Sequence, residues 1–148
     1  MKTNIEIEQF LIYLRGSIKK MQKVFNRELK TFDISSSHLV YMMLLRRHKE
    51  GLTMTELSKM SQVDKALTSR VMKELEGKEY IYRDTNNKHL RNYNICLTEK
   101  GFDLANIIDK ILKKNKKQIL KEFSTSEQKQ LYEVIVMLMN KFNKKEED

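Results

Sequence analysis

The sequence predicts a mainly helical chain of the α+β class with one small β element, and two observations predict it. Proline is absent and only four glycines occur in 148 residues, which is typical of helices interrupted only at turns. Apolar residues recur at three- and four-residue spacings over most of the chain, whereas 80–83 and 93–97 have strand-like composition and alternation. A hydrophobic content of 40% can build a core, so we expect a single domain over 1–148.

The charge of the chain indicates its class of partner. A formal charge of +9 and a pI near 9.5 favour a polyanion or a membrane surface over an acidic protein. No apolar run approaches the ~20 residues of a membrane span. The first nine residues, MKTNIEIEQ, contain acids where a signal peptide would be apolar. We therefore expect a cytoplasmic chain without a membrane partner.

Residues for metal, redox or catalytic chemistry are sparse. The lone Cys96 excludes an intrachain disulfide and a multi-cysteine zinc cluster, and we expect it to be an inert small side chain. His38, His48 and His89 are too dispersed for a metal-ligand spacing. The sequence contains no glycine-rich phosphate loop and no nucleophile–base spacing. We expect no enzyme, no catalytic residue, no metal site and no cofactor.

Long apolar stripes are found at both ends of the chain. The first helix is predicted over about 5–31, a second long helix starts at 98–101, and the last follows a capping box of Ser124 and Glu127. Their stripes carry more apolar surface than a small central domain can cover, and a homodimer is the simplest way to bury it. Residues 1–34 and 99–148 are thus predicted as dimerisation helices around a central region, 35–98.

The central region has the pattern of two short helices joined by a turn. Before these two helices, one of the serines 35–37 caps another helix, which runs from there to about His48. Thr53 and Glu56 form a capping box for a helix to about Met60; a turn over 61–63 follows, without the glycine often found there. Asp64 then caps a helix over about 65–76. With the predicted hairpin of 80–83 and 93–97, this is a winged helix-turn-helix.

The helix over 65–76 has two distinct faces. One side is formed by Leu67, Thr68, Val71, Met72 and Leu75. The other carries Lys65, Ala66, Ser69, Arg70 and Lys73, without a bulky residue. Such a surface suits a DNA major groove about 12 Å wide, although an ordinary amphipathic helix with a solvated polar face shows the same split.

Three segments of the chain resemble the MarR family of bacterial transcription regulators, and the resemblance covers nearly the whole length. They are VDKALTSRVMKELE (63–76), KEYIYR (78–83) and RNYNICLTEKG (91–101). The resemblance implies a triangular homodimer with intertwined terminal helices and two winged domains. It also implies binding to a pseudo-palindromic operator in double-stranded DNA, usually as a repressor.

The chain departs from the family pattern at two places. The wing usually carries Asp-x-Arg, and here the positions read His89-Leu90-Arg91, so Arg91 lacks its acidic neighbour. Thr68 stands at an apolar core position of the recognition helix, and Leu67 stands where a small polar residue is common. Some relatives sense peroxides through a cysteine in the first helix, where this chain has none.

The candidate site residues form four groups, each with a simpler alternative. Lys65, Ser69, Arg70 and Lys73 are candidates for DNA contacts of the recognition helix, where arginine can read guanine and lysine or serine can hold phosphate. Lys88, His89 and Arg91 are candidates in the wing, or an ordinary charged loop. Ser36, Ser37 and Thr55 could donate to phosphates or be helix caps. Tyr13, Tyr41 and Met42 could line a pocket for a small-molecule effector or pack in the core.

Two functions follow from these residues. The first is a homodimeric, sequence-specific DNA-binding regulator whose affinity a small ligand changes through the spacing of its two recognition helices. The second is a protein-interaction module, such as an adaptor or antirepressor, that keeps the winged fold without reading DNA. The basic charge and the unobstructed polar helix face favour the first.

Overall fold

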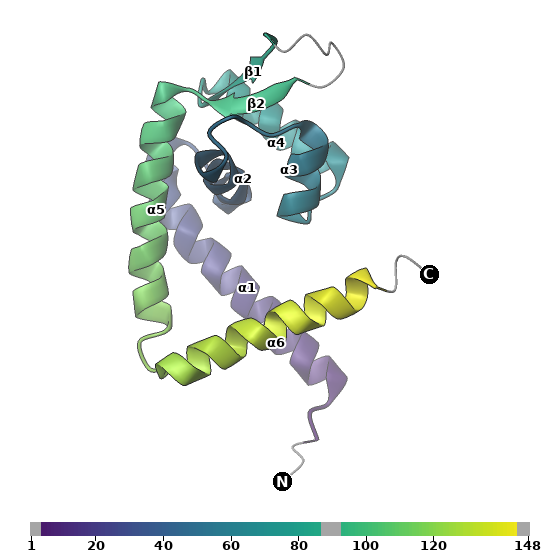
Figure 1. Ribbon diagram of the computed structural model, residues 1–148. Helices are drawn as coiled ribbons and strands as arrows, with labels where there is room; N and C mark the ends of the chain where they lie inside the picture. Colours follow the sequence, from purple (N-terminus) through teal and green to yellow (C-terminus); the bar gives the residue numbers. More distant parts are fainter. Residues whose placement is uncertain (1–3, 87–92, 145–148) are drawn as a thin grey trace. The chain divides into compact units, whose positions relative to one another are not determined.

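A computed structural model describes residues 4–86 and 93–144 (Figure 1). The chain divides into two compact units, Met1–Asp109 and Lys110–Asp148, and each is described by itself. The structure is mainly helical with one two-stranded antiparallel sheet, which confirms the predicted class. No helix in the described part of the chain is long and apolar enough to cross a membrane.

The first unit contains the helix-turn-helix and the hairpin. Its elements are α1 (Ile7–Leu29), the short 3-10 helix η1 (Lys30–Phe32), α2 (Ser36–Arg47), α3 (Met54–Ser61), α4 (Lys65–Gly77), β1 (Ile81–Asp84), β2 (Asn94–Leu97) and the first half of α5 (Glu99–Ile119). The strands pair from Ile81 with Leu97 to Asp84 with Asn94, and Leu52 adds a single bridge to Ile95. The helices and the hairpin follow the predicted order.

The ends of the short helices are fixed by the predicted capping residues. The Thr53 side chain accepts the Glu56 N–H at 3.2 Å, and the Glu56 carboxylate accepts the Thr53 N–H at 2.8 Å. Asp64 accepts the Leu67 N–H at 2.8 Å. Of the three candidate serines, Ser35 is the N-cap of α2. The side chains of Thr53, Glu56 and Asp64 satisfy backbone groups that would otherwise lack partners at the helix starts.

The core of the first unit lies between α2, α3, α4 and the hairpin, which Figure 1 shows grouped together. Its fully buried side chains include Tyr41, Met42, Leu45, Leu57, Val71, Met72, Leu75 and Ile95. Since α2 and α4 both contribute to it, the core fixes the orientation of the polar face of α4.

The start of α5 lies very close to the turn before β1. A side chain at Gly101 would place its Cβ 1.9 Å from the carbonyl oxygen of Tyr80, so only glycine fits without a shift of the backbone. The Thr98 N–H donates to the same carbonyl at 3.0 Å, and the Thr98 hydroxyl donates to the Glu79 carbonyl at 2.7 Å. The glycine that ends the LTEKG segment therefore has a structural reason.

Glu79 adopts a left-handed conformation, with φ of 62°, in the turn between α4 and β1. A side chain there costs about 1–2 kcal/mol that glycine avoids, although glycine loses more entropy on folding. We expect Glu79→Gly to stabilise the protein by about 0.5–1 kcal/mol in urea unfolding. Lys73→Gly, at an exposed position inside α4, is the control and should destabilise by about 1 kcal/mol. A loss of stability in both variants would contradict this explanation.

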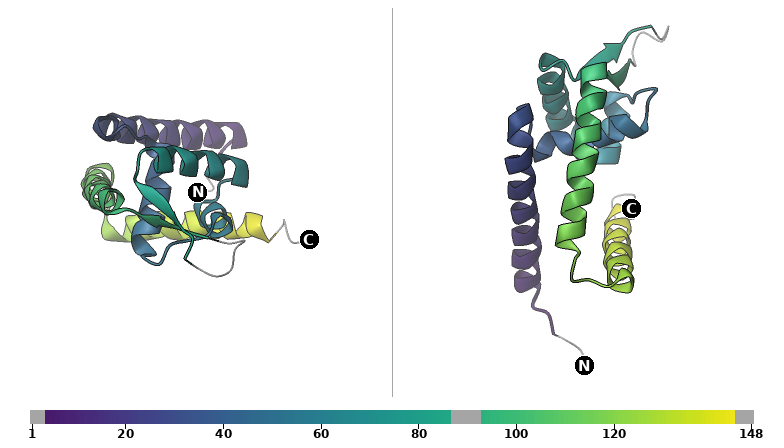
Figure 2. Two further views of the ribbon diagram at one scale, coloured as in Figure 1. Left: turned by 90° about the horizontal axis from the view of Figure 1, so that it is seen from above. Right: turned by 90° about the vertical axis from the view of Figure 1, so that its left-hand side faces the viewer.

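The second unit contains the end of α5 and the helix α6 (Thr125–Asn143). Both α1 and α5 are long continuous helices in the views of Figure 2. Ser124 caps α6 as predicted, accepting the Glu127 N–H at 3.2 Å while the Glu127 carboxylate accepts the Ser124 N–H at 2.7 Å. Most side chains of α6 are exposed, including Leu131, Ile135 and Phe142.

Candidate nucleic-acid interface

The predicted contact residues of α4 lie on one exposed helix face. Lys65, Arg70 and Lys73 are exposed, and the Arg70 side chain keeps 71% of its surface open. Ser69 between them is half-buried. The structure thus brings together three cationic side chains and a hydroxyl on a surface without large apolar side chains, as phosphate and base contacts require.

The opposite face of α4 anchors the helix in the core. Thr68, Val71, Met72 and Leu75 are buried there, and Leu67 is half-buried. The Thr68 hydroxyl lies 3.0 Å from the Tyr41 hydroxyl of α2, and both side chains are buried. This hydrogen bond satisfies a polar group in an otherwise apolar core, so threonine is tolerated at this position.

The turn between α3 and α4 forms without glycine. Gln62 takes the left-handed conformation, with φ of 59°, that a glycine would otherwise supply. The Ser58 hydroxyl donates to the Val63 carbonyl at 2.5 Å, and the Gln62 amide donates to the Lys59 carbonyl at 2.9 Å. These side-chain hydrogen bonds hold the turn, which sets the angle between the two helices.

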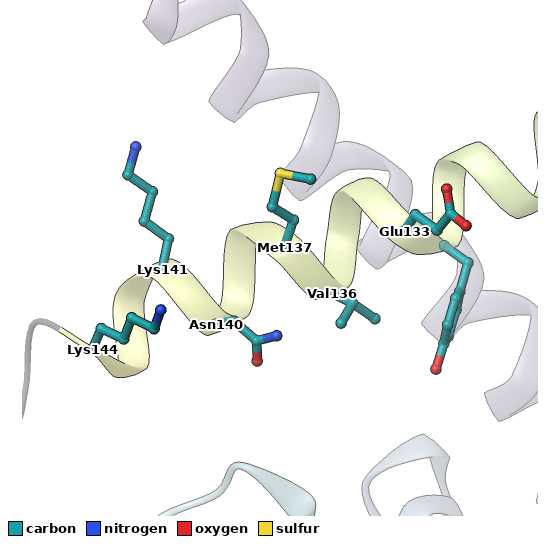
Figure 3. A pocket seen from close by; sticks show the side chains of 7 residues that line it. Glu133, Val136, Met137, Asn140, Lys141 and Lys144 are labelled. Carbon is teal, nitrogen blue, oxygen red and sulfur yellow. The ribbon is translucent and has the colours of Figure 1, made fainter.

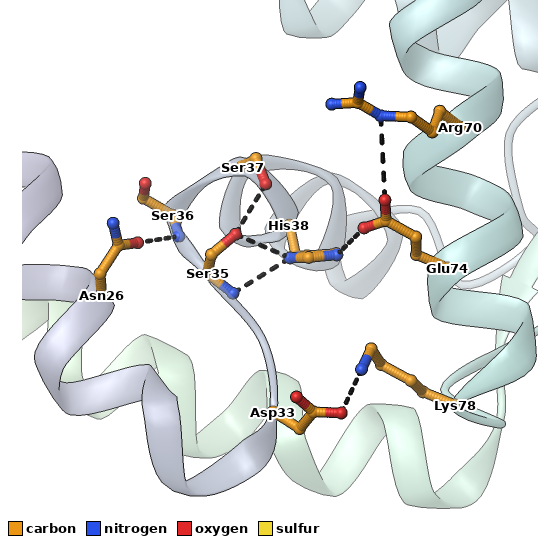
Figure 4. A network of polar contacts seen from close by, with 9 residues as sticks. All are labelled: Asn26, Asp33, Ser35, Ser36, Ser37, His38, Arg70, Glu74 and Lys78. Atoms are coloured by element: carbon orange, nitrogen blue, oxygen red, sulfur yellow. Dashed lines mark hydrogen bonds and ion pairs between the residues drawn. The ribbon is translucent and has the colours of Figure 1, made fainter.

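Glu74 on α4 is the centre of a polar network (Figure 4). One of its carboxylate oxygens lies 2.8 Å from Nε2 of His38 on α2, and the other lies 3.8 Å from Nε of Arg70. Neither the contact of Glu74 with Arg70 nor that of Glu74 with His38 was predicted. The four-residue spacing of Arg70 and Glu74 was a signal for their contact, whereas nothing in the sequence links His38 with a residue 36 positions later.

A second ion pair joins Lys78, the C-cap of α4, to Asp33 in the turn before α2. The hydrogen bond from Lys78, together with its positive charge, lowers the pKa of the Asp33 carboxyl. The pair thus stabilises the charged form of Asp33, and it connects the end of α4 to the segment that leads into α2.

The base of the hairpin holds an arginine in place. Arg83 on β1 lies 3.3 Å from the Glu76 carboxylate, donates to the Tyr93 hydroxyl at 2.7 Å and stacks 4.9 Å from the centre of the Tyr93 ring. Arg83 had no predicted role, and its contacts connect the hairpin to α4.

The three wing candidates Lys88, His89 and Arg91 lie outside the described residues.

The candidate phosphate contacts at helix starts are Ser36, Ser37 and Thr55. The alternative that they are helix caps is wrong, because Ser35 and Thr53 are the caps. The Ser36 N–H donates instead to the Asn26 side chain of α1 at 2.7 Å, and the Ser37 hydroxyl lies 2.7 Å from that of Ser35. Ser37 and Thr55 are exposed, and Ser36 is half-buried.

The candidate pocket residues lie in different environments. Tyr41 and Met42 are buried in the core, whereas 65% of Tyr13 on α1 is exposed. A depression of about 400 Å³ lies beside α4, and none of the three candidate pocket residues lines it. It is lined by Asn26, Lys30, Asp33, Ile34, Ser35, His38, Glu74 and Lys78.

A larger depression, of about 460 Å³, lies along α6 (Figure 3). Every residue that lines it belongs to this helix or its C-cap: Tyr132, Glu133, Val136, Met137, Asn140, Lys141 and Lys144. Since a single helix cannot enclose a ligand, this depression is an open helix face.

Cys96 lies in β2 with its side chain buried. Burial raises the pKa of its thiol, so the thiolate, which is the reactive form, is disfavoured at neutral pH. Within 4–86 and 93–144, no group of three or more His, Cys, Asp or Glu side chains is arranged to hold a metal ion.

Comparison with known proteins connects this geometry to a family. Residues 34–93 match the family model described as MarR family. The chain is 28% identical to the HTH-type transcriptional regulator BilQ of Clostridioides difficile over 129 residues, which are 86% of each chain. It is 29% identical to the HTH-type transcriptional regulator SarZ of Staphylococcus aureus over 118 residues, covering 80% of this chain and 75% of SarZ.

Solved structures share the fold. The MepR–DNA complex of S. aureus has a TM-score of 0.83 at 22% identity and covers 90% of this chain and 97% of MepR. A MarR family regulator from Listeria monocytogenes, complexed with a 26mer DNA, has a TM-score of 0.82 at 21% identity, covering 88% and 87% of the two chains. At these identities the likeness shows the fold alone.

Proposed function

We propose that this chain, whose residues 34–93 match the MarR family model, is a MarR-family transcriptional regulator that binds a pseudo-palindromic operator in double-stranded DNA as a homodimeric repressor. In this proposal each α4 enters a major groove, and the two half-sites lie about 34–36 Å apart along the duplex. The hairpin of each winged region contacts the adjacent DNA.

The observation that carries the proposal is the exposed face of α4. Lys65, Arg70 and Lys73 share it with Ser69, and the buried opposite face holds the helix in a fixed orientation. Arginine can donate two hydrogen bonds to the guanine edge, whereas lysine and serine suit phosphate oxygens.

Exposed apolar stripes support the homodimer. In the single chain, Phe10, Leu14 and Ile18 of α1 each keep 40% or more of their surface exposed, and Ile135 and Phe142 of α6 keep 55% and 61%. Apolar helix faces of this size usually mark interfaces. We expect sedimentation to give twice the chain mass of 17.7 kDa throughout a dilution series. The mass of one chain at all concentrations would contradict the homodimer.

Binding is expected to weaken steeply with salt, because lysine and arginine contacts to phosphates release counterions from the duplex. With about six phosphate contacts, affinity should fall about a thousandfold between 50 and 200 mM salt. Fluorescence anisotropy would measure this with a duplex selected from a random pool. An affinity that does not change with salt would instead favour a protein-interaction adaptor or antirepressor.

A small-molecule effector is the remaining part of the proposal. The depression lined by His38, Glu74 and Lys78 adjoins α4, and Tyr13 is the exposed member of the predicted pocket residues. An effector that binds in this depression would release DNA only if it bound the protein more tightly at one spacing of the recognition helices than at the other.

A further inference from the structure

Arg70 lies beside Glu74, whose carboxylate is itself hydrogen-bonded to His38. Nδ1 of His38 accepts the Ser35 backbone N–H at 3.0 Å, so the proton of a neutral His38 ring lies on Nε2. Nε2 then donates to Glu74 at 2.8 Å. Because the His38 side chain is only 7% exposed, it fixes one carboxylate oxygen of Glu74 while the other faces Arg70.

The contact engages only one edge of the arginine. Glu74 lies 3.8 Å from Nε of Arg70, and the two terminal nitrogens point away from the carboxylate in Figure 4. A guanidinium has five N–H donors in a rigid plane, so, within the residues that the structure describes, both terminal nitrogens remain able to donate to an acceptor outside the protein.

We propose that Glu74 is a positioning residue for sequence recognition: fixed by His38, its carboxylate aims the two terminal nitrogens of Arg70 at a guanine edge. This inference rests on the proposed function, because it presumes that Arg70 reads DNA. A bidentate contact requires a defined plane for the guanidinium, whereas a single contact to phosphate does not. Glu74 therefore raises the affinity for the operator relative to the affinity for other sequences.

The alternative is a surface ion pair with no consequence for binding. An exposed pair of this spacing changes an equilibrium only about twofold by itself, so stability measurements cannot separate the two. The two alternatives are separated by the ratio of the affinities for a selected and a scrambled duplex, because a merely structural ion pair would not change this ratio.

The experiment measures this ratio for Glu74→Gln and for the matched control Glu76→Gln. Both changes remove one negative charge from α4, but Glu76 pairs with Arg83 and not with Arg70. We expect Glu74→Gln to lower the ratio about three- to tenfold, which is part of what a bidentate guanine contact supplies, and Glu76→Gln to leave it unchanged. Circular dichroism confirms that each variant is folded.

Two further variants separate position from charge. Glu74→Asp keeps the charge but shortens the side chain, so it should lower the ratio as Glu74→Gln does. In an Arg70→Ala background, Glu74→Gln should have no further effect.

The proposal is overturned if Glu74→Asp keeps the full ratio, if the two glutamine variants behave alike, or if the effect persists without Arg70. A wild-type protein without preference for the selected duplex would overturn the proposed function, and this inference with it.

Discussion

The Arg70→Ala variant is expected to lose most of its preference for the operator while remaining a folded dimer. Arg70 is the arginine of the exposed α4 face, and it lies outside the core because 71% of its side chain is open. One bidentate contact to guanine contributes about 1–3 kcal/mol of discrimination. We therefore expect a fall of about 10- to 100-fold in the affinity ratio between a selected and a scrambled duplex.

Lys73→Ala is the matched control for this variant. Lys73 is exposed on the same face of α4, but a lysine on phosphate holds all sequences alike. Its removal should weaken both duplexes equally and reduce the salt slope by about one. If Arg70→Ala behaved as Lys73→Ala is expected to, with an unchanged ratio, Arg70 would be a phosphate contact and another residue would read the bases.

The features that sequence predicted well are those set by neighbours along the chain. The capping box of Thr53 and Glu56 and the N-cap Asp64 mark helix starts in the sequence, and the structure confirms both. The side of α4 that faces the core follows from its apolar spacing alone. Local hydrogen bonding and burial determine these features, so a single sequence contains the necessary information.

The features that sequence did not predict depend on residues far apart in the chain. Thr68 is buried in an apolar core because Tyr41, 27 residues earlier, supplies a hydroxyl partner. His38 reaches Glu74 across 36 residues. Spacing on one helix cannot reveal such partners, because they depend on how α2 packs against α4. Tyr41 and Met42 are different, because core packing was one of their two predicted roles and their burial favours it over pocket lining.

Gly101→Ala is expected to give the largest loss of stability. The added Cβ would lie 1.9 Å from the Tyr80 carbonyl oxygen and 2.9 Å from its carbon, and both are backbone atoms that cannot rotate away. The start of α5 must then move, which strains the bond from the Thr98 N–H to the same carbonyl. Overpacking of this kind costs about 1–3 kcal/mol or more, and we expect a net loss of about 2 kcal/mol after the helical preference of alanine is counted.

Urea unfolding at a fixed protein concentration would measure this loss, with Gly77→Ala as the control. A Cβ at Gly77, the last residue of α4, would meet nothing within 4 Å, so that variant should be as stable as the wild type or slightly more stable. Equal stability of both variants would mean that α5 can shift at no cost. Since α5 leads from the hairpin into the second unit, a fixed start of this helix is a condition for the proposed fixed spacing of two recognition helices, and a freely shifting one would argue against it.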